Sequence, residues 1–459
     1  MLDTASNPVT PDAQSAGGVS DPGPATDSTR LRAATGAIRT LGTNPATAPI
    51  MLHPGDAIPT RRRVLYIILL GALTALGPFT IDLYLPAFPV LEDDFQTTSA
   101  AIQLTLTGTM IGFAVGQLVV GPLSDKVGRR MPLIAVTVLH VLASAAAALS
   151  PTLITLGAAR FFMGVGAAAG GVVAMAIVRD LFGGKRLVVM LSRLALVSGV
   201  APVIAPLIGS ALLIVMPWQG IFVVLAVYGI VMLVCTVFFI PETLPPARRH
   251  DKGSTTTWQR YRSVLSDRVF LGVLVIGGMN FSGLFSYLSA SPFLFQEGYG
   301  FDPQAYGLLF AVNSLGIVFG VQMASRLAAR FGPQWVLAFS TAGTVVFGAA
   351  IILADSLGLG LWGTMVPLFL FITSVGFGFP CVQVLALDRH GKAAGTAASI
   401  LGAVNFGVAG AISPLVGWLS ASAGITATTM ASVMVGCGAI AVIALWTIVR
   451  PRTVQALTP

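Results

Sequence analysis

Charged side chains are scarce in this sequence. Lys, Arg, Asp and Glu together make up 10% of its 459 residues, compared with about 25% in a typical soluble domain. Apolar residues make up 55%, and they gather in long runs. A soluble surface needs more polar side chains than this composition supplies. The shortage of charge therefore predicts a polytopic membrane protein.

Cysteines and the motifs of common catalytic sites are also sparse. All three cysteines lie inside apolar runs, at Cys235, Cys381 and Cys437. Their positions indicate neither a disulfide framework nor a metal site. The four histidines are scattered, and the sequence has no Walker-type phosphate loop. We therefore expect no enzyme activity, no metal, no cofactor and no ATP-driven transport.

Twelve apolar runs follow residue 63, each long enough to cross a bilayer core of about 30 Å. An even number of crossings places both termini on one side of the membrane. The sequence predicts an all-α protein whose twelve transmembrane helices form two pseudo-symmetric six-helix bundles around a central cavity. The runs are 64–91, 100–122, 131–149, 152–178, 188–215, 218–240, 268–296, 305–325, 334–354, 358–386, 394–420 and 425–449.

Residues 1–60 lack apolar periodicity and are rich in Pro, Ala, Thr, Ser and Gly. They also lack the basic-then-apolar pattern of a secretory signal peptide. We expect a disordered cytoplasmic N-terminal tail. The alternative is that translation begins later, for instance at Met51.

Basic residues mark one side of the membrane. Of the 26 Lys and Arg residues, all but Arg160 fall in the tails, the central loop, or the loops and helix ends of one side. This bias predicts a bacterial inner-membrane protein with both termini in the cytoplasm. Because the basic residues lie in short loops, the net charge of +8 does not indicate nucleic-acid binding. The opposite loops carry acids: Glu92, Asp93, Asp94, Glu297, Asp302 and Asp355.

The longest connection between apolar runs, residues 241–267, divides the helices six and six. It predicts a cytoplasmic linker between an N-terminal bundle over 61–240 and a C-terminal bundle with a short tail over 268–459. The halves repeat weakly, since Gly332 occupies the loop position that Gly128 occupies in the first half. Where the first half has Asp125, the second half has Ala329.

A dense group of charges lies at residues 121–130, in a tight turn between two uncharged runs. We expect a latch in which Asp125 caps the helix that begins near Ala394. Lys126, Arg129 and the nearby Asp180 would add charge pairs. The alternative is a basic loop that only sets topology. The residues assigned to this cytoplasmic gate are Gly121, Asp125, Lys126, Gly128, Arg129, Arg130 and Asp180.

Several segments of the sequence resemble those of a known family. Residues 121–130 (GPLSDKVGRR) resemble the loop signature of the major facilitator superfamily, and residues 160–167 (RFFMGVGA) resemble its fourth-helix motif. Further segments look like the Bcr/CflA group of drug:proton antiporters, which includes bicyclomycin and chloramphenicol exporters. Those segments are 81–89 (IDLYLPAFP), 179–182 (RDLF), 242–246 (ETLPP) and 285–293 (FSYLSASPF).

The resemblance implies a proton-coupled secondary transporter that exports small, mostly amphipathic compounds by alternating access. Its implied partners are a small-molecule substrate, protons and the lipid bilayer, with no nucleic acid, and a monomer is expected. The sequence departs from the group at 205–210 (APLIGS), where the antiporter motif usually ends GPxxGG. The alternatives are a proton-coupled transporter of an endogenous metabolite, such as an amino acid or a siderophore, and a non-transporting membrane receptor or structural protein.

Asp82 and Arg160 are the acidic and basic residues predicted deepest in the membrane, each about 15 Å from the acidic side at 1.5 Å per helical residue. A charge at that depth costs at least about 2.5–3.5 kcal/mol, so each is a candidate functional residue and each is the other's expected partner. We expect Asp82 to carry the coupling proton and to release Arg160 when it is neutral. The alternative is a static salt bridge between the first and fourth helices.

Polar and aromatic residues in the apolar runs are candidates for the substrate cavity. Tyr84 and Phe285 are candidate aromatic contacts, and Asn280 and Tyr287 are spaced to share one helix face. The buried amides either bond across helices or line the cavity: Gln117, Asn280, Gln322, Gln383 and Asn405. Small residues and prolines favour close helix packing, at Gly164, Gly166, Pro202, Pro206 and Gly209.

Overall fold

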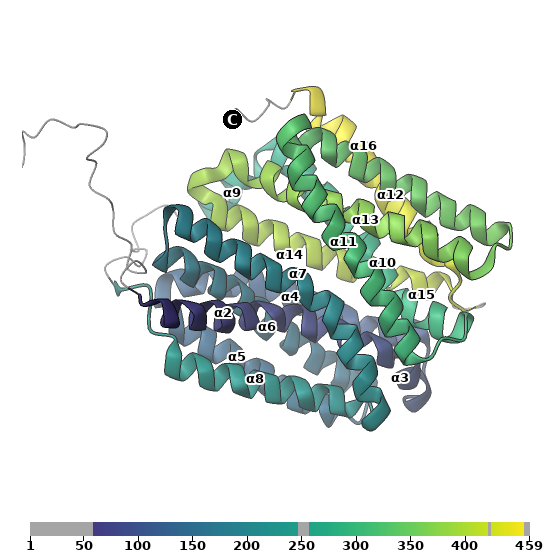
Figure 1. The fold of residues 1–459 in the computed structure, drawn as a ribbon, viewed down its shortest axis with the longest axis horizontal. Coiled ribbons are helices and arrows are strands. Elements are labelled where there is room, and N and C mark those ends of the chain that lie inside the picture. Colours follow the sequence, from purple (N-terminus) through teal and green to yellow (C-terminus); the bar gives the residue numbers. More distant parts are fainter. Residues whose placement is uncertain (1–57, 247–256, 421–423, 454–459) are drawn as a thin grey trace, which may run out of the picture. The chain divides into compact units, whose positions relative to one another are not determined.

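The computed structural model describes residues 58–246, 257–420 and 424–453, and all of them belong to a single unit. Within these ranges helices are the only regular secondary structure, and twelve of them are long and apolar enough to cross a membrane (Figure 1). The prediction of an all-α protein with twelve transmembrane helices is confirmed. The predicted tail 1–60, except at its end, and the middle of the predicted linker 241–267 lie outside the described residues.

The long helices follow the predicted runs. In the first half they are α2 (Thr60–Asp82), α4 (Ser99–Val127), α5 (Arg130–Ala148), α6 (Leu153–Leu181), α7 (Gly184–Val215) and α8 (Gln219–Phe239). In the second half they are α10 (Arg268–Phe293), α11 (Pro303–Phe331), α12 (Pro333–Ser356), α13 (Gly360–Leu387), α14 (Ala394–Ile412) and α16 (Ala427–Ala444). However, α4 and α11 extend beyond the predicted ends 122 and 325 to Val127 and Phe331, so the predicted turn at 121–130 is helical up to Val127. Short elements connect or extend them: η3 (Leu85–Ala87), α3 (Phe88–Asp94), α9 (Thr257–Leu265), η5 (Leu294–Gly298), η6 (Asp388–Ala393), α15 (Leu415–Leu419), η7 (Leu445–Val449) and η8 (Pro451–Thr453).

Polar side chains cap several helix starts. Thr98 accepts a hydrogen bond from the backbone N–H of the third residue after it, and Asp302 does the same at α11. Thr152 and Thr426 form capping boxes at α6 and α16. Such caps satisfy donors that the helix itself leaves unpaired, and they place the helix starts at the edges of the apolar runs.

Two predicted helices are interrupted. The run 64–91 breaks after Asp82, so α2 ends there and the chain continues through η3 and α3. The run 394–420 breaks near Pro414, between α14 and α15. Proline donates no backbone N–H and disfavours a helical conformation in the residue before it. The first membrane span, Arg61–Asp94, thus continues past Asp82 as expected, but through a 3-10 turn and not as one unbroken α-helix.

Matching helix pairs pack together in the two halves. α4 packs against α6 as α11 packs against α13, and α5 packs against α8 as α12 packs against α16. α4 and α11 also end in the same way, at Gly128 and Gly332, which have φ values of 109° and 86°. This left-handed region favours glycine. The two halves are thus pseudo-symmetric, whereas the residue boundaries of the bundles, 61–240 and 268–459, stay a prediction.

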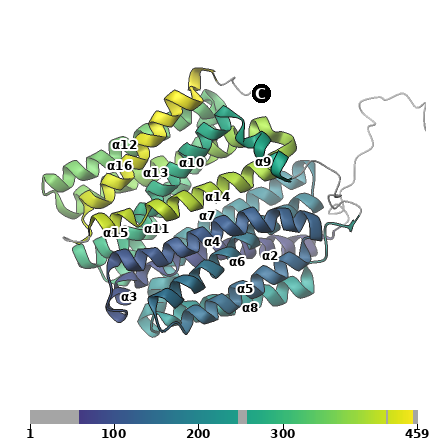
Figure 2. The ribbon, with the colours of Figure 1, turned by 180° about the vertical axis from the view of Figure 1, so that it is seen from behind.

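The halves meet along two helix pairs, α4 with α14 and α7 with α11 (Figures 1 and 2). We call the end of the helices that holds Glu92, Glu297 and Asp355 the acidic end, and the end that holds Lys126, Arg130 and Arg330 the basic end. Hydrogen bonds join the halves in the part of the protein nearer the acidic end. They run from Thr107 Oγ1 to Gly410 O (2.9 Å), Gly417 N to Gln103 Oε1 (3.2 Å), Gln304 Nε2 to Ser210 O (3.1 Å) and Gln296 Nε2 to Pro86 O (3.2 Å).

Small residues bring helix backbones together. The predicted packing residues are Gly164 and Gly166 on α6, and Pro202, Pro206 and Gly209 on α7. A Cβ atom at Gly164 would lie 2.1 Å from the carbonyl oxygen of Thr109 on α4, and one at Gly209 would lie 2.1 Å from that of Leu83. No side chain fits at such distances, which supports the packing interpretation at these two glycines.

Candidate functional site

Arg160 lies in α6 and is fully buried. Its Nη1 donates a hydrogen bond to the carbonyl oxygen of Thr80 at 2.6 Å. The guanidinium carbon lies 4.3 Å from the ring centroid of Tyr84 and 5.9 Å from that of Phe222. This is the geometry of a cation–π contact, which suits the flat guanidinium group. Nε and Nη2 have no hydrogen-bond partner among the described residues, so the charge is only partly satisfied.

The break in the first helix supplies the acceptor for Arg160. Carbonyl groups in the last turn of a helix have no intrahelical donor. Because α2 ends at Asp82, the carbonyl of Thr80 lies in that last turn and is available to the guanidinium. The prolines that follow, Pro86 and Pro89, therefore help to shape the environment of a charged residue on another helix.

Asp82 is the last residue of α2 and is 5% exposed. Its carboxylate lies within electrostatic range of Arg160 and also of Tyr287 and Tyr306. Among the described residues no ion pair joins Asp82 to Arg160. The structure thus brings the two predicted residues near each other without a direct salt bridge, so the static salt bridge given above as the alternative is not formed here. Those two tyrosines belong to α10 and α11 of the other half, so the charge of Asp82 acts on both halves.

Tyr287 and Tyr306 belong to a buried polar cluster of the second half. The hydroxyl of Tyr287 accepts a hydrogen bond from Asn313 Nδ2 at 3.0 Å, and Tyr306 Oη and Ser291 Oγ are 3.0 Å apart. Sequence reasoning missed Tyr306 and Asn313. The signal was present at Asn313, an amide in the middle of an apolar run.

The four predicted substrate residues lie in four different surroundings. Tyr84 is fully buried beneath Arg160, with its hydroxyl 3.1 Å from Thr105 Oγ1. Tyr287 belongs to the polar cluster described above. Phe285 packs against Phe281, with ring centroids 4.8 Å apart. Asn280 lines a cavity that Tyr287 does not line, so these two residues do not face the same space.

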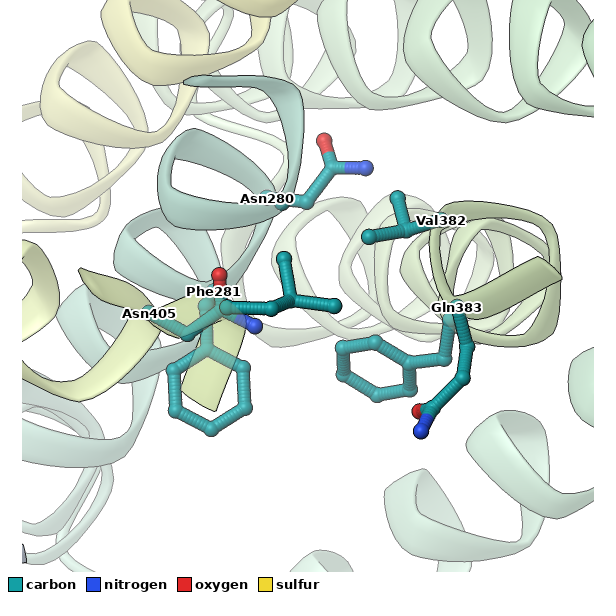
Figure 3. A pocket seen from close by; sticks show the side chains of 8 residues that line it. Asn280, Phe281, Val382, Gln383 and Asn405 are labelled. Atoms are coloured by element: carbon teal, nitrogen blue, oxygen red, sulfur yellow. The ribbon is translucent and has the colours of Figure 1, made fainter. Parts of the chain in front are cut away.

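A cavity of about 200 Å³ lies among α10, α13 and α14 (Figure 3). Asn280 lines it, whereas Tyr84, Phe285 and Tyr287 do not. Of the other predicted amides, Gln383 and Asn405 also lie at this cavity, which residues of the second half line; whether they line the central cavity between the halves stays a prediction. The residues that line the cavity among α10, α13 and α14 are Gly277, Asn280, Phe281, Phe379, Val382, Gln383, Leu401 and Asn405.

Arg129 organises the charged turn at the basic end. Its Nε donates to Asp180 Oδ2 at 2.9 Å, and its Nη1 donates to Asp125 Oδ1 and to Ser124 Oγ. Burial lowers the pKa of Arg129, whereas the hydrogen bond to Asp180 and the charge of Asp125 raise it, and the net pKa lies above its usual value. The predicted pairing of Arg129 with Asp180 is present in the structure.

The expected cap on the second half is not made in this structure. Asp125 pairs with Arg129 four residues away, so its carboxylate does not cap the helix that begins at Ala394. The basic end of α4 does approach that helix, since a Cβ atom at Gly121 would lie 3.5 Å from Ser399 Oγ. Lys126 is exposed in the last turn of α4. The charged cluster thus joins helices of the first half to one another.

Glu242 is a member of this cluster that sequence reasoning missed. Its carboxylate accepts hydrogen bonds from the backbone N–H groups of Arg129 (2.9 Å) and Arg130 (3.3 Å) at the start of α5. The next residue, Thr243, donates to Asp180 at 3.2 Å. A carboxylate at a helix N-terminus is favoured by the N–H groups there. The segment after α8 therefore holds the turn in place, and in the sequence its residues 242–246 (ETLPP) indicate only a family resemblance.

Comparison with known families agrees with the arrangement of the helices. The model of the Major Facilitator Superfamily matches residues 67–414. The chain belongs to the major facilitator superfamily. The protein is therefore a transporter and not an enzyme, and it is a multi-pass protein of the bacterial inner-membrane type.

This superfamily member has similar relatives over most of its length. The Uncharacterized MFS-type transporter YdgK of Bacillus subtilis (strain 168) is 35% identical, covering 88% of this chain and 100% of the relative. The Bicyclomycin resistance protein homolog of Haemophilus influenzae is 30% identical, covering 83% and 95%. The Multidrug resistance protein MdtL of Citrobacter koseri is 31% identical, covering 82% and 94%. The predicted resemblance to the Bcr/CflA group is confirmed by these names.

Solved structures of the superfamily share the fold. A bacterial homolog of the human lysosomal transporter Spinster, in an inward-facing and unoccupied conformation, superposes with a TM-score of 0.66. It is 14% identical in sequence, and the match covers 88% of this chain and 100% of that chain. At this identity the likeness concerns the fold alone.

Proposed function

We propose that this protein is a proton-coupled secondary transporter that exports small, mostly amphipathic compounds by alternating access. The observation that carries the proposal is the buried charge of Arg160, incompletely hydrogen-bonded and within electrostatic range of the buried Asp82. Charges inside a membrane protein are costly and usually belong to ion or substrate pathways. A purely structural role would be served at lower cost by an apolar pair.

Asp82 carries the coupling proton in this proposal. When Asp82 is ionised, its charge compensates that of Arg160. When Asp82 binds a proton, the compensation is lost, and the nearby hydroxyl groups of Tyr287 and Tyr306 face a neutral carboxyl group instead of an anion. Because those tyrosines belong to α10 and α11, protonation changes the electrostatics between the halves. Movement of the halves is the step that alternating access requires.

The charge bias of the loops supports an orientation with the basic end and both termini in the cytoplasm. The hydrogen bonds between the halves then lie toward the outside, and they support a conformation closed on that side. The cluster around Arg129 acts as a cytoplasmic gate. In this structure the cluster joins helices of the first half to one another. When the cytoplasmic side closes, Asp125 would leave Arg129 and cap the helix beginning at Ala394.

The names of the relatives support export of drugs, since two of them are described by resistance to bicyclomycin or to several drugs. The experiment is transport in everted membrane vesicles, with a panel of labelled drugs, amino acids and siderophores. We expect accumulation of drugs in the vesicles, abolished by an uncoupler. Accumulation that survives the uncoupler would contradict proton coupling. Selective transport of an amino acid or a siderophore would replace drug export with metabolite transport.

A further inference from the structure

The cavity among α10, α13 and α14 contains side chains with unused hydrogen-bonding capacity. Asn280 is 4% exposed, and both its Oδ1 and its Nδ2 have no partner among the described residues. Asn405 Oδ1 is also buried without a partner. A buried polar atom without a partner costs about 1–3 kcal/mol. Amides in this condition at the wall of a cavity indicate that something else completes their hydrogen bonds.

Glycines make room for both amides. A Cβ atom at Gly378 would lie 2.9 Å from Asn280 Nδ2, and one at Gly277 would lie 3.0 Å from Asn405 Oδ1. Any larger residue at either position would push the amide out of place. Figure 3 shows Asn280 on α10 and Asn405 on α14 at the cavity, with Gln383 of α13 also at its wall. Gln383 is exposed, so it marks the open side of the cavity, whereas Asn280 lies in its depth.

The lining selects for neutral ligands. None of the described residues that line the cavity is ionisable, so a charged group would lose its hydration without gaining an opposite charge. The amides offer donors and acceptors together, which suits another amide or a urea. Phe281 and Phe379, with ring centroids 6.0 Å apart, add aromatic surface for a flat group.

The volume limits the size of what fits. Small-molecule sites usually measure about 300–1,000 Å³, and a cavity of about 150 Å³ accepts benzene. At about 200 Å³, this cavity holds one ring with a small polar substituent. It is therefore large enough for part of a drug-sized compound and too small for the whole.

We propose that this cavity is a binding subsite for the uncharged, amide- or urea-bearing part of the transported compound. The proposal rests on the proposed function and deepens it by naming a substrate class. Asn280 and Asn405 hold the polar group, and Phe281 and Phe379 hold the ring or chain that bears it. The exposed Gln383 meets the substrate at the mouth.

The subsite is also connected to the first half. Phe281 packs against Phe406 of α14, with ring centroids 4.9 Å apart. Phe406 in turn stacks on Phe113 of α4 at 4.7 Å, with the ring planes 20° apart. A ligand bound against Phe281 therefore lies next to the aromatic rings that join the halves. These ring contacts must change when the halves move relative to each other.

Binding of tritiated benzamide to the purified full-length protein tests the proposal. Benzamide is a single ring with one neutral amide, and benzoate, benzylammonium and toluene are analogues of nearly the same size. We expect saturable benzamide binding, with at least about tenfold weaker competition by each analogue, because a site built for hydrogen bonds rejects ligands that leave its polar groups unpaired. Undetectable benzamide binding, or equal competition by the charged analogues, would overturn the proposal.

Substitutions test whether Asn280 and Asn405 hold the amide group of the ligand. Asn280→Leu and Asn405→Leu keep the side-chain size and remove the polar atoms, and each should weaken benzamide binding about tenfold. Gln334→Leu is the matched control, because Gln334 is a buried amide with an unpartnered oxygen on α12, away from the cavity. Asn280→Asp should lose benzamide and gain benzylammonium, a result that loss of folding cannot produce. Wild-type benzamide affinity in both leucine variants would refute the assignment.

The binding assay uses no pH gradient, so its outcome is independent of proton coupling. Benzamide binding without uncoupler-sensitive transport would leave the subsite standing and remove the proposed coupling. Coupled transport by a protein that does not bind benzamide would leave the proposed coupling standing and remove the subsite.

Discussion

At the scale of single residues, Arg160 carries a charge whose burial is only partly compensated by hydrogen bonds. It is fully buried, and its surroundings offer it one carbonyl oxygen, two aromatic rings and a carboxylate at a distance. Each of these favours the charge moderately, and none neutralises it by direct contact. A charge that is held but incompletely paired can respond when a nearby group changes its own charge.

The electrostatic link between Asp82 and Arg160 is measurable by a double-mutant cycle. We expect Asp82→Asn and Arg160→Gln each to lower the unfolding temperature in detergent, and the pair together to lower it by less than the sum. Residues in one electrostatic network usually show coupling of about 0.5–3 kcal/mol. The control cycle combines Asp82→Asn with Arg193→Gln, which is exposed on α7 and should give additive effects. Additivity in both cycles would show that the two buried charges do not interact.

The sequence identified Asp82 and Arg160 because a charge inside an apolar run is visible without a structure. It did not reveal that Thr80 would bind Arg160, because a backbone carbonyl carries no sequence signal and was released here by a helix break. Glu242 was missed for a different reason. Its role depends on the meeting of the segment after α8 with the start of α5, far apart in the sequence.

At the scale of helices, the contact between α7 and the segment after α2 depends on one small residue. The structure leaves no space for a Cβ atom at Gly209, whereas Gly199 on the same helix faces open space. The contact at Gly209 holds Leu83, next to Asp82, so the packing of α7 also fixes the position of the proposed proton carrier.

Substitution of these two glycines separates packing from helix propensity. Gly209→Ala should destabilise the protein by about 1–3 kcal/mol, because an added methyl group forces the backbones apart. Gly199→Ala should be neutral or slightly stabilising, since alanine favours the helix and meets nothing. The measurement is the unfolding temperature of both variants in the same detergent. Equal stability of the two variants would refute the close contact.

Helix positions were predictable because long apolar runs carry a strong signal. The breaks near Asp82 and Pro414 were harder to predict, because proline is tolerated inside membrane helices when its surroundings satisfy the freed backbone groups. Pro122 and Pro202 lie inside unbroken helices of this protein. Proline alone therefore does not show where a helix stops.

At the scale of the whole molecule, the placement of charge predicts the orientation. Ser356 is exposed at the acidic end and Arg330 is exposed at the basic end. In a variant without native cysteines, Ser356→Cys should react with a membrane-impermeant maleimide added to intact cells. Arg330→Cys should react only after the membrane is opened. The opposite pattern would reverse the proposed orientation, and with it the side on which the halves are closed.

The contact between the halves could not be predicted from the sequence. The groups that join them include the hydroxyl of Thr107 and the carbonyl of Gly410, which resemble those of any other membrane helix. The expected link through Asp125 was absent from this structure because Arg129 is a nearer partner. Such contacts change between conformations, so no single pattern of residues specifies them.

The central claim is that Asp82 couples transport to protons, and its most direct test compares the wild type with Asp82→Asn in proteoliposomes. The substrate is the compound that the vesicle panel identifies. Exchange of labelled for unlabelled substrate, without a gradient, serves as the control that the variant is folded and still carries substrate. We predict that Asp82→Asn keeps this exchange and loses accumulation driven by a pH gradient. Gradient-driven accumulation at the wild-type rate and level would contradict the account.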